Sequence, residues 1–178
     1  EFWPYLRDPV TLARPWAIPG TPGLEHRIGG IEKADGTGNI SYDPENHERM
    51  VRLRADKVAG IARDIPPVMV TGDVDDAELL AVGWGSTWGA IDGAMNRCRK
   101  RGHKVAHAHL THLNPFPANL GEVLAKYPRV VVPEMNLGQL SHLIRSQYLV
   151  DARPVNKVQG TPFTAGELEA AFLKEIEQ

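Results

Sequence analysis

The sequence lacks several features that mark particular classes of protein. Its single cysteine, Cys98, excludes a disulfide framework within the chain. No apolar run approaches the roughly 18 residues of a membrane-spanning helix, and no charged-then-apolar signal opens the chain. The formal net charge of −2 offers no basic surface for nucleic acid or anionic lipid. We therefore expect a cytoplasmic protein without nucleic-acid or membrane partners.

The first 40 residues hold five prolines and six glycines and show no sustained periodicity. They also hold large apolar side chains such as Trp3 and Trp16, which need a surface to pack against. The chain begins at Glu1 without a methionine, which we interpret as a piece of a longer protein. We expect residues 1–65 to form an extended arm and a connecting helix that end an upstream domain, and residues 66–178 to form an α/β domain.

Strand and helix patterns alternate after residue 66. The expected strands are 78–83, 104–110, 130–132 and an edge strand at 154–158. The expected helices are 44–61, 86–101, 119–126, 139–149 and a last one opened by the capping box of Thr164 and Glu167. Ser86 is the expected cap of its helix, and the expected inward residues of helix 139–149 are Leu140, Leu143, Ile144 and Leu149. The alternation predicts a mainly parallel sheet with helices on both faces.

Polar residues follow the β-branched strand Val130–Val132. Glu134, Asn136, Gly138 and Gln139 come at its end, before a helical pattern begins. Binding crevices of open α/β sheets lie outside the carboxyl ends of the strands, which indicates an interface or a site. Asn and Gly also suit turns, so an ordinary turn that opens the helix explains the same residues. Both interpretations stay open from the sequence.

Residues 83–89 (Gly-Trp-Gly-Ser-Thr-Trp-Gly) lie between a strand and a helix, the context of a dinucleotide-binding turn. The third glycine falls one place late, and the next strand ends without the acid that would bind a ribose. A tight turn explains these glycines better than a nucleotide site. A stand-alone nucleotide- or anion-binding module remains an alternative.

Histidines suggest two further sites. His103, His107, His109 and His112 form a histidine-rich segment, in which His107 and His109 share one face of a strand, but no carboxylate or cysteine there completes a metal set. Ordinary buried histidines are the favoured interpretation, and a pH-sensitive or interface role stays open for His109 or His112. His26 and His47 lie beside carboxylates but have no adjacent nucleophile, so they predict local hydrogen bonds rather than a catalytic pair.

Several motifs together resemble one enzyme family. They are Pro19–His26, Tyr42–Met50, Asn114–Pro117, Val132–Leu140 and Asn156–Phe163. In these stretches the chain resembles the carboxyl-terminal part of the alpha subunit of 2-oxoacid:ferredoxin oxidoreductases, and most of all the 2-oxoglutarate:ferredoxin oxidoreductases. The resemblance implies that residues from about 66 onward fold like the transketolase carboxyl-terminal domain.

The resemblance also implies a reaction and its partners. The whole enzyme would decarboxylate a 2-oxoacid on thiamine diphosphate, pass electrons through an iron–sulfur cluster to ferredoxin, and transfer the acyl group to coenzyme A. The resemblance implies that thiamine diphosphate, Mg²⁺ and the cluster belong to the beta subunit, and this chain accordingly has no cysteine set and no thiamine motif. We expect no catalytic, cofactor or metal residue here. The expected interface and channel residues are Glu134, Asn136, Gly138, Gln139, His26 and His109.

Overall fold

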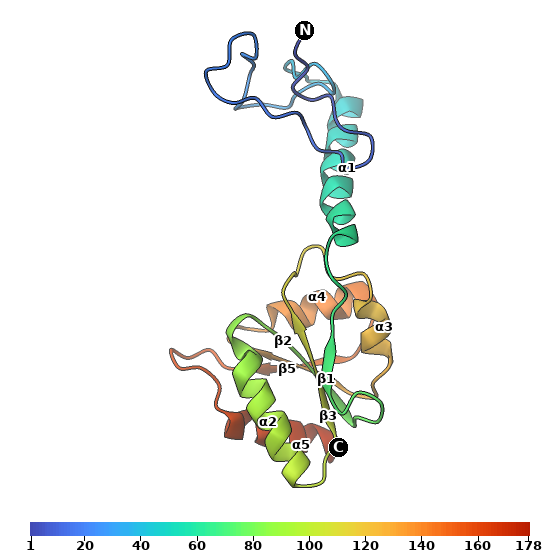
Figure 1. The fold of residues 1–178 in the computed structure, drawn as a ribbon, viewed down its shortest axis with the longest axis vertical. Coiled ribbons are helices and arrows are strands. Elements are labelled where there is room, and N and C mark those ends of the chain that lie inside the picture. The colour runs from blue at the N-terminus through green and yellow to red at the C-terminus, as the bar shows by residue number, and fades with distance from the viewer. The chain divides into compact units, whose positions relative to one another are not determined.

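The computed structural model describes residues 1–178, which divide into two compact units, Glu1–Asp64 and Ile65–Gln178. Figure 1 labels the helices and strands of both units. None of these helices combines the length and the apolar character that crossing a bilayer requires.

The first unit consists of an irregular arm followed by helix α1 (Pro44–Gly60) and a 3-10 turn (Ile61–Arg63). Helix α1 begins as predicted, because the Asp43 carboxylate accepts a hydrogen bond from the Glu45 amide at 3.1 Å. The arm contains only two isolated β-bridges, Tyr5–Gly36 and Lys33–Ile40.

Very little of the first unit is buried. The buried residues of this unit are Pro4, Lys33, Gly36, Gly38 and Met50. The Lys33 ammonium donates to the carbonyls of Gly29 at 2.8 Å and Ile31 at 2.5 Å. The hydrogen bonds of this buried charge, rather than an apolar core, therefore hold the loop. In contrast, Trp16 is 93% exposed.

The second unit is built on a five-stranded sheet with the order β1-β3-β2-β4-β5. Its strands are β1 (Val70–Gly72), β2 (Leu79–Trp84), β3 (Val105–Leu110), β4 (Val130–Glu134) and β5 (Ala152–Asn156). All neighbouring pairs are parallel except β1 and β3, which are antiparallel. The predicted edge strand lies at an edge as β5, where the missing N–H of Pro154 is tolerated.

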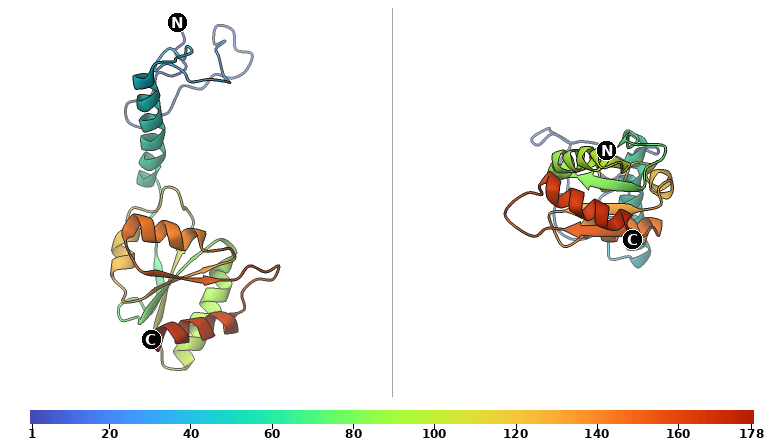
Figure 2. Two further views of the ribbon diagram at one scale, coloured as in Figure 1. Left: turned by 180° about the vertical axis from the view of Figure 1, so that it is seen from behind. Right: turned by 90° about the horizontal axis from the view of Figure 1, so that it is seen from below.

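Helices cover both faces of this sheet (Figure 2). Helices α2 (Trp88–Lys100) and α5 (Ala165–Ile176) pack on one face through residues such as Ile91 and Phe172. Helices α3 (Leu120–Ala125) and α4 (Gln139–Tyr148) pack on the other through residues such as Leu120 and Ile144. The predicted α/β class with a mainly parallel sheet is therefore confirmed, and it is consistent with a transketolase carboxyl-terminal type of fold.

Three local predictions differ from the structure. Strand β1 was not predicted, because three residues are too few to show a period. Ser86 does not cap α2, because a 3-10 turn at Gly85–Thr87 precedes this helix. Leu143 is 50% exposed and Leu149 is 89% exposed, so only Leu140 and Ile144 of the four expected inward residues are buried.

Candidate functional site

Glu134 ends the buried strand β4, and its side chain is completely buried. Its carboxylate accepts hydrogen bonds from the backbone amides of Leu140 at 2.8 Å and Ser141 at 3.0 Å, both in the first turn of α4. The amide group of Asn136 donates to the same carboxylate at 3.2 Å. A helix begins with unpaired amides and a partial positive charge, so this anion completes the start of α4.

The next residues form a tight turn around one amide oxygen. The Asn136 side-chain oxygen accepts from the backbone amides of Gly138 at 2.7 Å and Gln139 at 3.0 Å. Gly138 has φ +94°, and a Cβ there would lie 2.9 Å from the Ser141 hydroxyl oxygen, so a larger residue would not fit without a shift. The turn therefore uses Asn136 and Gly138 for its own geometry.

These contacts show what the strand end can do chemically. The Glu134 and Asn136 side chains are occupied by backbone and neighbouring amides, as the turn interpretation of the sequence expects. What this loop presents outward is Leu137, which is 77% exposed, and the exposed Gln139. The interface function of the loop stays a prediction.

His107 and His109 lie together on β3 under helix α2. The Nδ1 atom of His109 lies 3.3 Å from the Nε2 atom of His107, and their rings meet edge to face. Burial, and to a smaller extent the neighbouring His109, lower the pKa of His107 to about 4. Burial also lowers the pKa of His109, although a hydrogen bond with the Gly85 backbone raises it in part. Both rings are therefore neutral at neutral pH.

A pocket of about 280 Å³ lies beside this histidine pair. Trp88, which is 52% exposed, and Met69, which is 76% exposed, are among its lining residues. Sequence reasoning missed this pocket, because Met69 comes from the unpredicted segment around β1. Gly83 makes the close packing beside it possible, since a Cβ there would lie 2.5 Å from the Ile91 side chain and 3.0 Å from His109. Gly83 lies within strand β2, whereas Gly85, with φ +58°, takes the turn role that the tight-turn interpretation of residues 83–89 expects.

The histidine-rich segment does not assemble a metal site. His103 faces Glu78 at 3.4 Å, whereas the His112 Nδ1 atom lies 2.9 Å from the Thr111 hydroxyl. No group of three histidine, cysteine, aspartate or glutamate side chains converges on one point anywhere in the chain.

His26 belongs to the first unit. Its Nδ1 atom lies 2.8 Å from the Leu24 carbonyl oxygen, and its ring meets the Phe2 ring edge to face at 5.3 Å. His47 lies 2.5 Å from the Glu32 carboxylate, which lowers the pKa of Glu32. Both histidines make hydrogen bonds, but not with the carboxylates beside them in sequence: His26 contacts a backbone carbonyl, and the partner of His47 lies 15 residues away.

Fold and site together define a mainly parallel α/β domain in which the polar side chains at the end of β4 bind the first amides of α4. An arm with little core precedes this domain in the sequence. The model of pyruvate:ferredoxin oxidoreductase core domain II matches residues 77–168, which is more than half of the chain, and the chain belongs to this family.

The chain is also similar to longer proteins. It is 58% identical, over 99% of its length, to the 2-oxoglutarate oxidoreductase subunit KorA of Mycobacterium tuberculosis, and it covers 28% of that protein. It is 32% identical, over 78% of its length, to the 2-oxoglutarate synthase subunit KorA of Methanocaldococcus jannaschii, and it covers 38% of that protein.

Among solved structures it matches the 2-oxoglutarate:ferredoxin oxidoreductase from Magnetococcus marinus with 2-oxoglutarate, coenzyme A and succinyl-CoA bound. The TM-score is 0.86 and the identity 33%, over 97% of this chain and 30% of that one. The chain thus spans about a third of these relatives.

Proposed function

We propose that this chain is a carboxyl-terminal portion of the alpha subunit of a thiamine-diphosphate-dependent 2-oxoglutarate:ferredoxin oxidoreductase. The whole enzyme oxidatively decarboxylates 2-oxoglutarate, transfers the succinyl group to coenzyme A and reduces ferredoxin. The observation that carries this proposal is the 58% identity to a 2-oxoglutarate oxidoreductase subunit over 99% of the chain. The fold likeness to a solved enzyme that binds 2-oxoglutarate and succinyl-CoA supports the same substrate.

In this proposal the thiamine diphosphate, Mg²⁺ and iron–sulfur cluster belong to the beta subunit. The donor set of this chain supports that division, because a cluster needs several accessible thiolates. The one thiol, that of Cys98, is buried on α2, and burial raises its pKa to about 11, so it is a poor ligand at neutral pH.

The portion itself supplies interface rather than catalytic groups. The loop from Glu134 to Gln139 faces a subunit or domain boundary near the active-site channel, and the exposed Leu137 supports this role. His109 lies in the same region of the sheet, and the loop that carries His26 covers the channel entrance. Asn136→Ala in the full-length enzyme should weaken assembly or turnover. Unchanged assembly and turnover would remove the interface role from this loop.

The decisive experiment uses the full-length parent chain co-expressed with its beta subunit. The assay follows reduction of a low-potential viologen with coenzyme A and either 2-oxoglutarate or pyruvate. Reduction that depends on 2-oxoglutarate is the expected result. Reduction that depends on pyruvate would keep the family and change the substrate. A cluster-loaded complex that reduces viologen with neither acid would refute the proposed activity.

A further inference from the structure

Four cationic side chains converge on one pocket of the first unit. Arg7 and Arg14 come from the arm, and Arg54 and Lys57 come from helix α1; together they are called the basic pocket. Its volume is about 540 Å³, within the range of ligand and peptide sites. The remaining lining residues are Tyr5, Val58 and Ile61. The chain as a whole has a net charge of −2, so this gathering of positive charge is local.

These cations have almost no negative partners within the chain. Arg7, Arg14 and Lys57 form no salt bridge, and Arg54 reaches the Glu32 carboxylate only at 3.5 Å. Glu32 is already bound to His47 at 2.5 Å. The only carboxylates that act on the four cations are that of Glu32, shared with His47, and that of Asp35, which attracts Arg7 but pairs with Arg49 at 2.7 Å. The basic pocket therefore has a surplus of positive charge.

The arm holds two of the cations at the pocket in defined positions. One Arg7 guanidinium nitrogen donates to the Leu12 carbonyl at 3.0 Å, whereas its Nε atom is buried without a hydrogen-bond partner. The Arg14 guanidinium lies 4.3 Å from the centre of the Tyr5 ring, a cation–π contact. Burial and repulsion by Arg14 lower the pKa of Arg7, and the attraction of Asp35 offsets only part of this shift. The geometry thus presents positive charge to something outside the chain.

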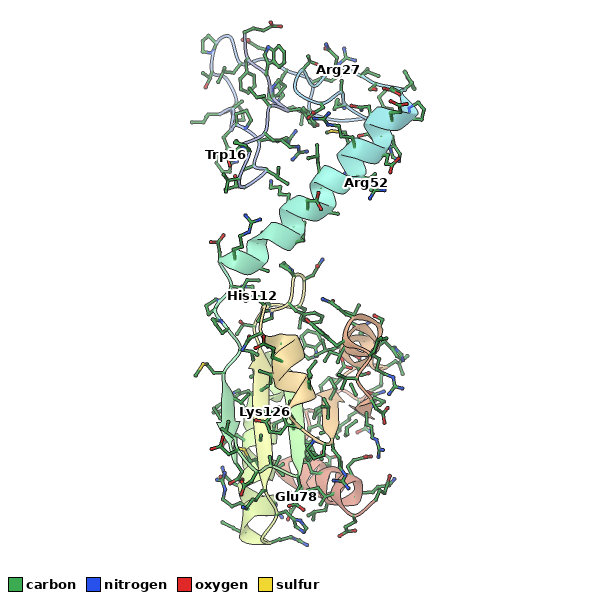
Figure 3. All side chains as sticks on the ribbon, turned by 90° about the vertical axis from the view of Figure 1, so that its right-hand side faces the viewer. Trp16, Arg27, Arg52, Glu78, His112 and Lys126 are labelled. Atoms are coloured by element: carbon green, nitrogen blue, oxygen red, sulfur yellow. The ribbon has the colours of Figure 1, made fainter.

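The surroundings indicate that the missing anion belongs to a protein. Two apolar side chains that line the basic pocket are exposed, Val58 by 37% and Ile61 by 46%. Near its arginines in sequence, Leu6, Val10 and Trp16 are exposed by 62%, 68% and 93%. Figure 3 shows the Trp16 side chain on the outside of the arm. A free phosphate would neutralise the cations but leave this apolar surface in water. A protein segment with carboxylates beside apolar residues would cover both.

We propose that the basic pocket binds an acidic segment of the partner beta subunit, with at least two carboxylates placed against Arg7, Arg14 and Lys57 and an apolar side chain against Val58 and Ile61. The arm has little core of its own, which suits a segment that is ordered by packing on another subunit. The identity of the partner as the beta subunit rests on the proposed function, whereas the pocket and its positive charge are observed in this chain.

A zero-length carbodiimide cross-link tests the contact in the purified alpha–beta complex. This reagent joins an amine to a carboxylate only when the two groups touch, so the Lys57 ammonium is the probe. Mass spectrometry should identify an amide bond between Lys57 and an aspartate or glutamate of the beta subunit, and Lys57→Gln should abolish it. Cross-links from Lys57 only to the alpha subunit would overturn the proposal. So would protection of Lys57 by inorganic pyrophosphate without any link to the beta subunit.

Charge reversal measures the strength of the same contact. Lys57→Glu should raise the dissociation constant of the two subunits at least about tenfold, as for other charges paired across an interface. Lys100→Glu is the matched control, because Lys100 is also a lysine, is exposed on helix α2, forms no salt bridge and lies outside the basic pocket. Equal dissociation constants for the two variants would refute the contact.

The viologen assay on the same preparation separates the two proposals. Reduction with 2-oxoglutarate but no cross-link to the beta subunit would leave the function standing and remove the basic pocket as a docking site. If the cross-link forms but the cluster-loaded complex reduces viologen with neither 2-oxoglutarate nor pyruvate, the docking site would stand and the proposed function would be refuted.

Discussion

The two units of this chain place their apolar side chains in opposite positions. In Ile65–Gln178 the large apolar residues lie on both faces of a sheet, where α2 and α5 cover one face and α3 and α4 cover the other. In Glu1–Asp64 the buried set is small, and Trp16 and Ile28 are 93% and 80% exposed. The second unit therefore carries its own core, whereas the first leaves most of its large apolar side chains uncovered.

Matched truncations in the two units should show the largest contrast. Phe172 is completely buried in the α2–α5 face, so Phe172→Ala should lower the free energy of unfolding by about 3–5 kcal/mol. Trp16→Ala should change it by less than about 0.5 kcal/mol in the isolated chain, since a 93% exposed side chain has few contacts to lose. Urea unfolding followed by circular dichroism measures both. Equal losses would contradict the comparison.

Removal of the helix-capping carboxylate should be the next largest effect. Glu134→Ala should lower the stability of the second unit by about 2–4 kcal/mol, because it leaves the buried amides of Leu140 and Ser141 without an acceptor. Gln139→Ala is the control at the same turn, since the Gln139 side chain is exposed, and it should change stability by less than about 0.5 kcal/mol. If Glu134→Ala matched this control in urea unfolding, the carboxylate would have no capping role.

The buried histidine should make the second unit sensitive to acid. The pKa of His107 is about 4 in the folded protein against 6.5 in a free side chain, so below pH 6.5 the unfolded chain binds a proton that the folded chain does not. Stability should therefore fall as the pH decreases from 6.5 to 4, by at most about 3 kcal/mol from this group. Urea midpoints between pH 4 and 7 measure the slope. His107→Leu should reduce that slope, and an unchanged slope would assign the acid sensitivity to other groups.

Loss of one helix cap in each unit should give the smallest effects and the sharpest comparison. Thr164 accepts from the Glu167 amide at 3.2 Å, so Thr164→Ala should lower the global stability of the second unit by about 1 kcal/mol. Asp43→Ala, which removes the cap of α1, should reduce helical content without moving the unfolding midpoint of the second unit. A shared shift of that midpoint would show that the two units unfold together.

The fold of the second unit followed from its pattern because the central strands β2 and β4 are continuous apolar runs and the helices carry periodic apolar faces. The strand at 130–132 and the capping box at Thr164 lie where the sequence predicts them, and the edge strand overlaps its predicted range but begins two residues earlier. The errors occur where local rules compete. Ser86 is a good cap by type, but the Thr87 hydroxyl contacts the Trp84 backbone and α2 starts later. Leu143 fits a helical stripe, yet it is half exposed, because only a narrow side of α4 is buried. Leu149 is largely exposed because α4 ends at Tyr148 and Leu149 caps it with φ +55°.

The candidate site was predicted only in part. The residues at the end of β4 were recognised as special, but the sequence left a turn and an interface equally open. The turn contacts of Glu134 and Asn136 are now defined, whereas the interface role of Glu134, Asn136, Gly138, Gln139, His26 and His109 stays a prediction. The basic pocket was missed because Arg7 and Arg14 are some 40 to 50 residues from Arg54 and Lys57 in the chain. No spacing rule joins residues that far apart.

The sequence alone determined the α/β class, the order of most helices and strands, and the family resemblance. Period, turn residues and caps act over a few residues, so they can be recognised without any tertiary contact. Only the tertiary structure decided that the Glu134 carboxylate caps the start of α4 and that His107 is buried and neutral beside His109. It also brought the cations of the arm and of α1 together in one pocket. These properties depend on burial and on distances between segments remote in sequence, and burial and charge proximity arise only when the chain has folded.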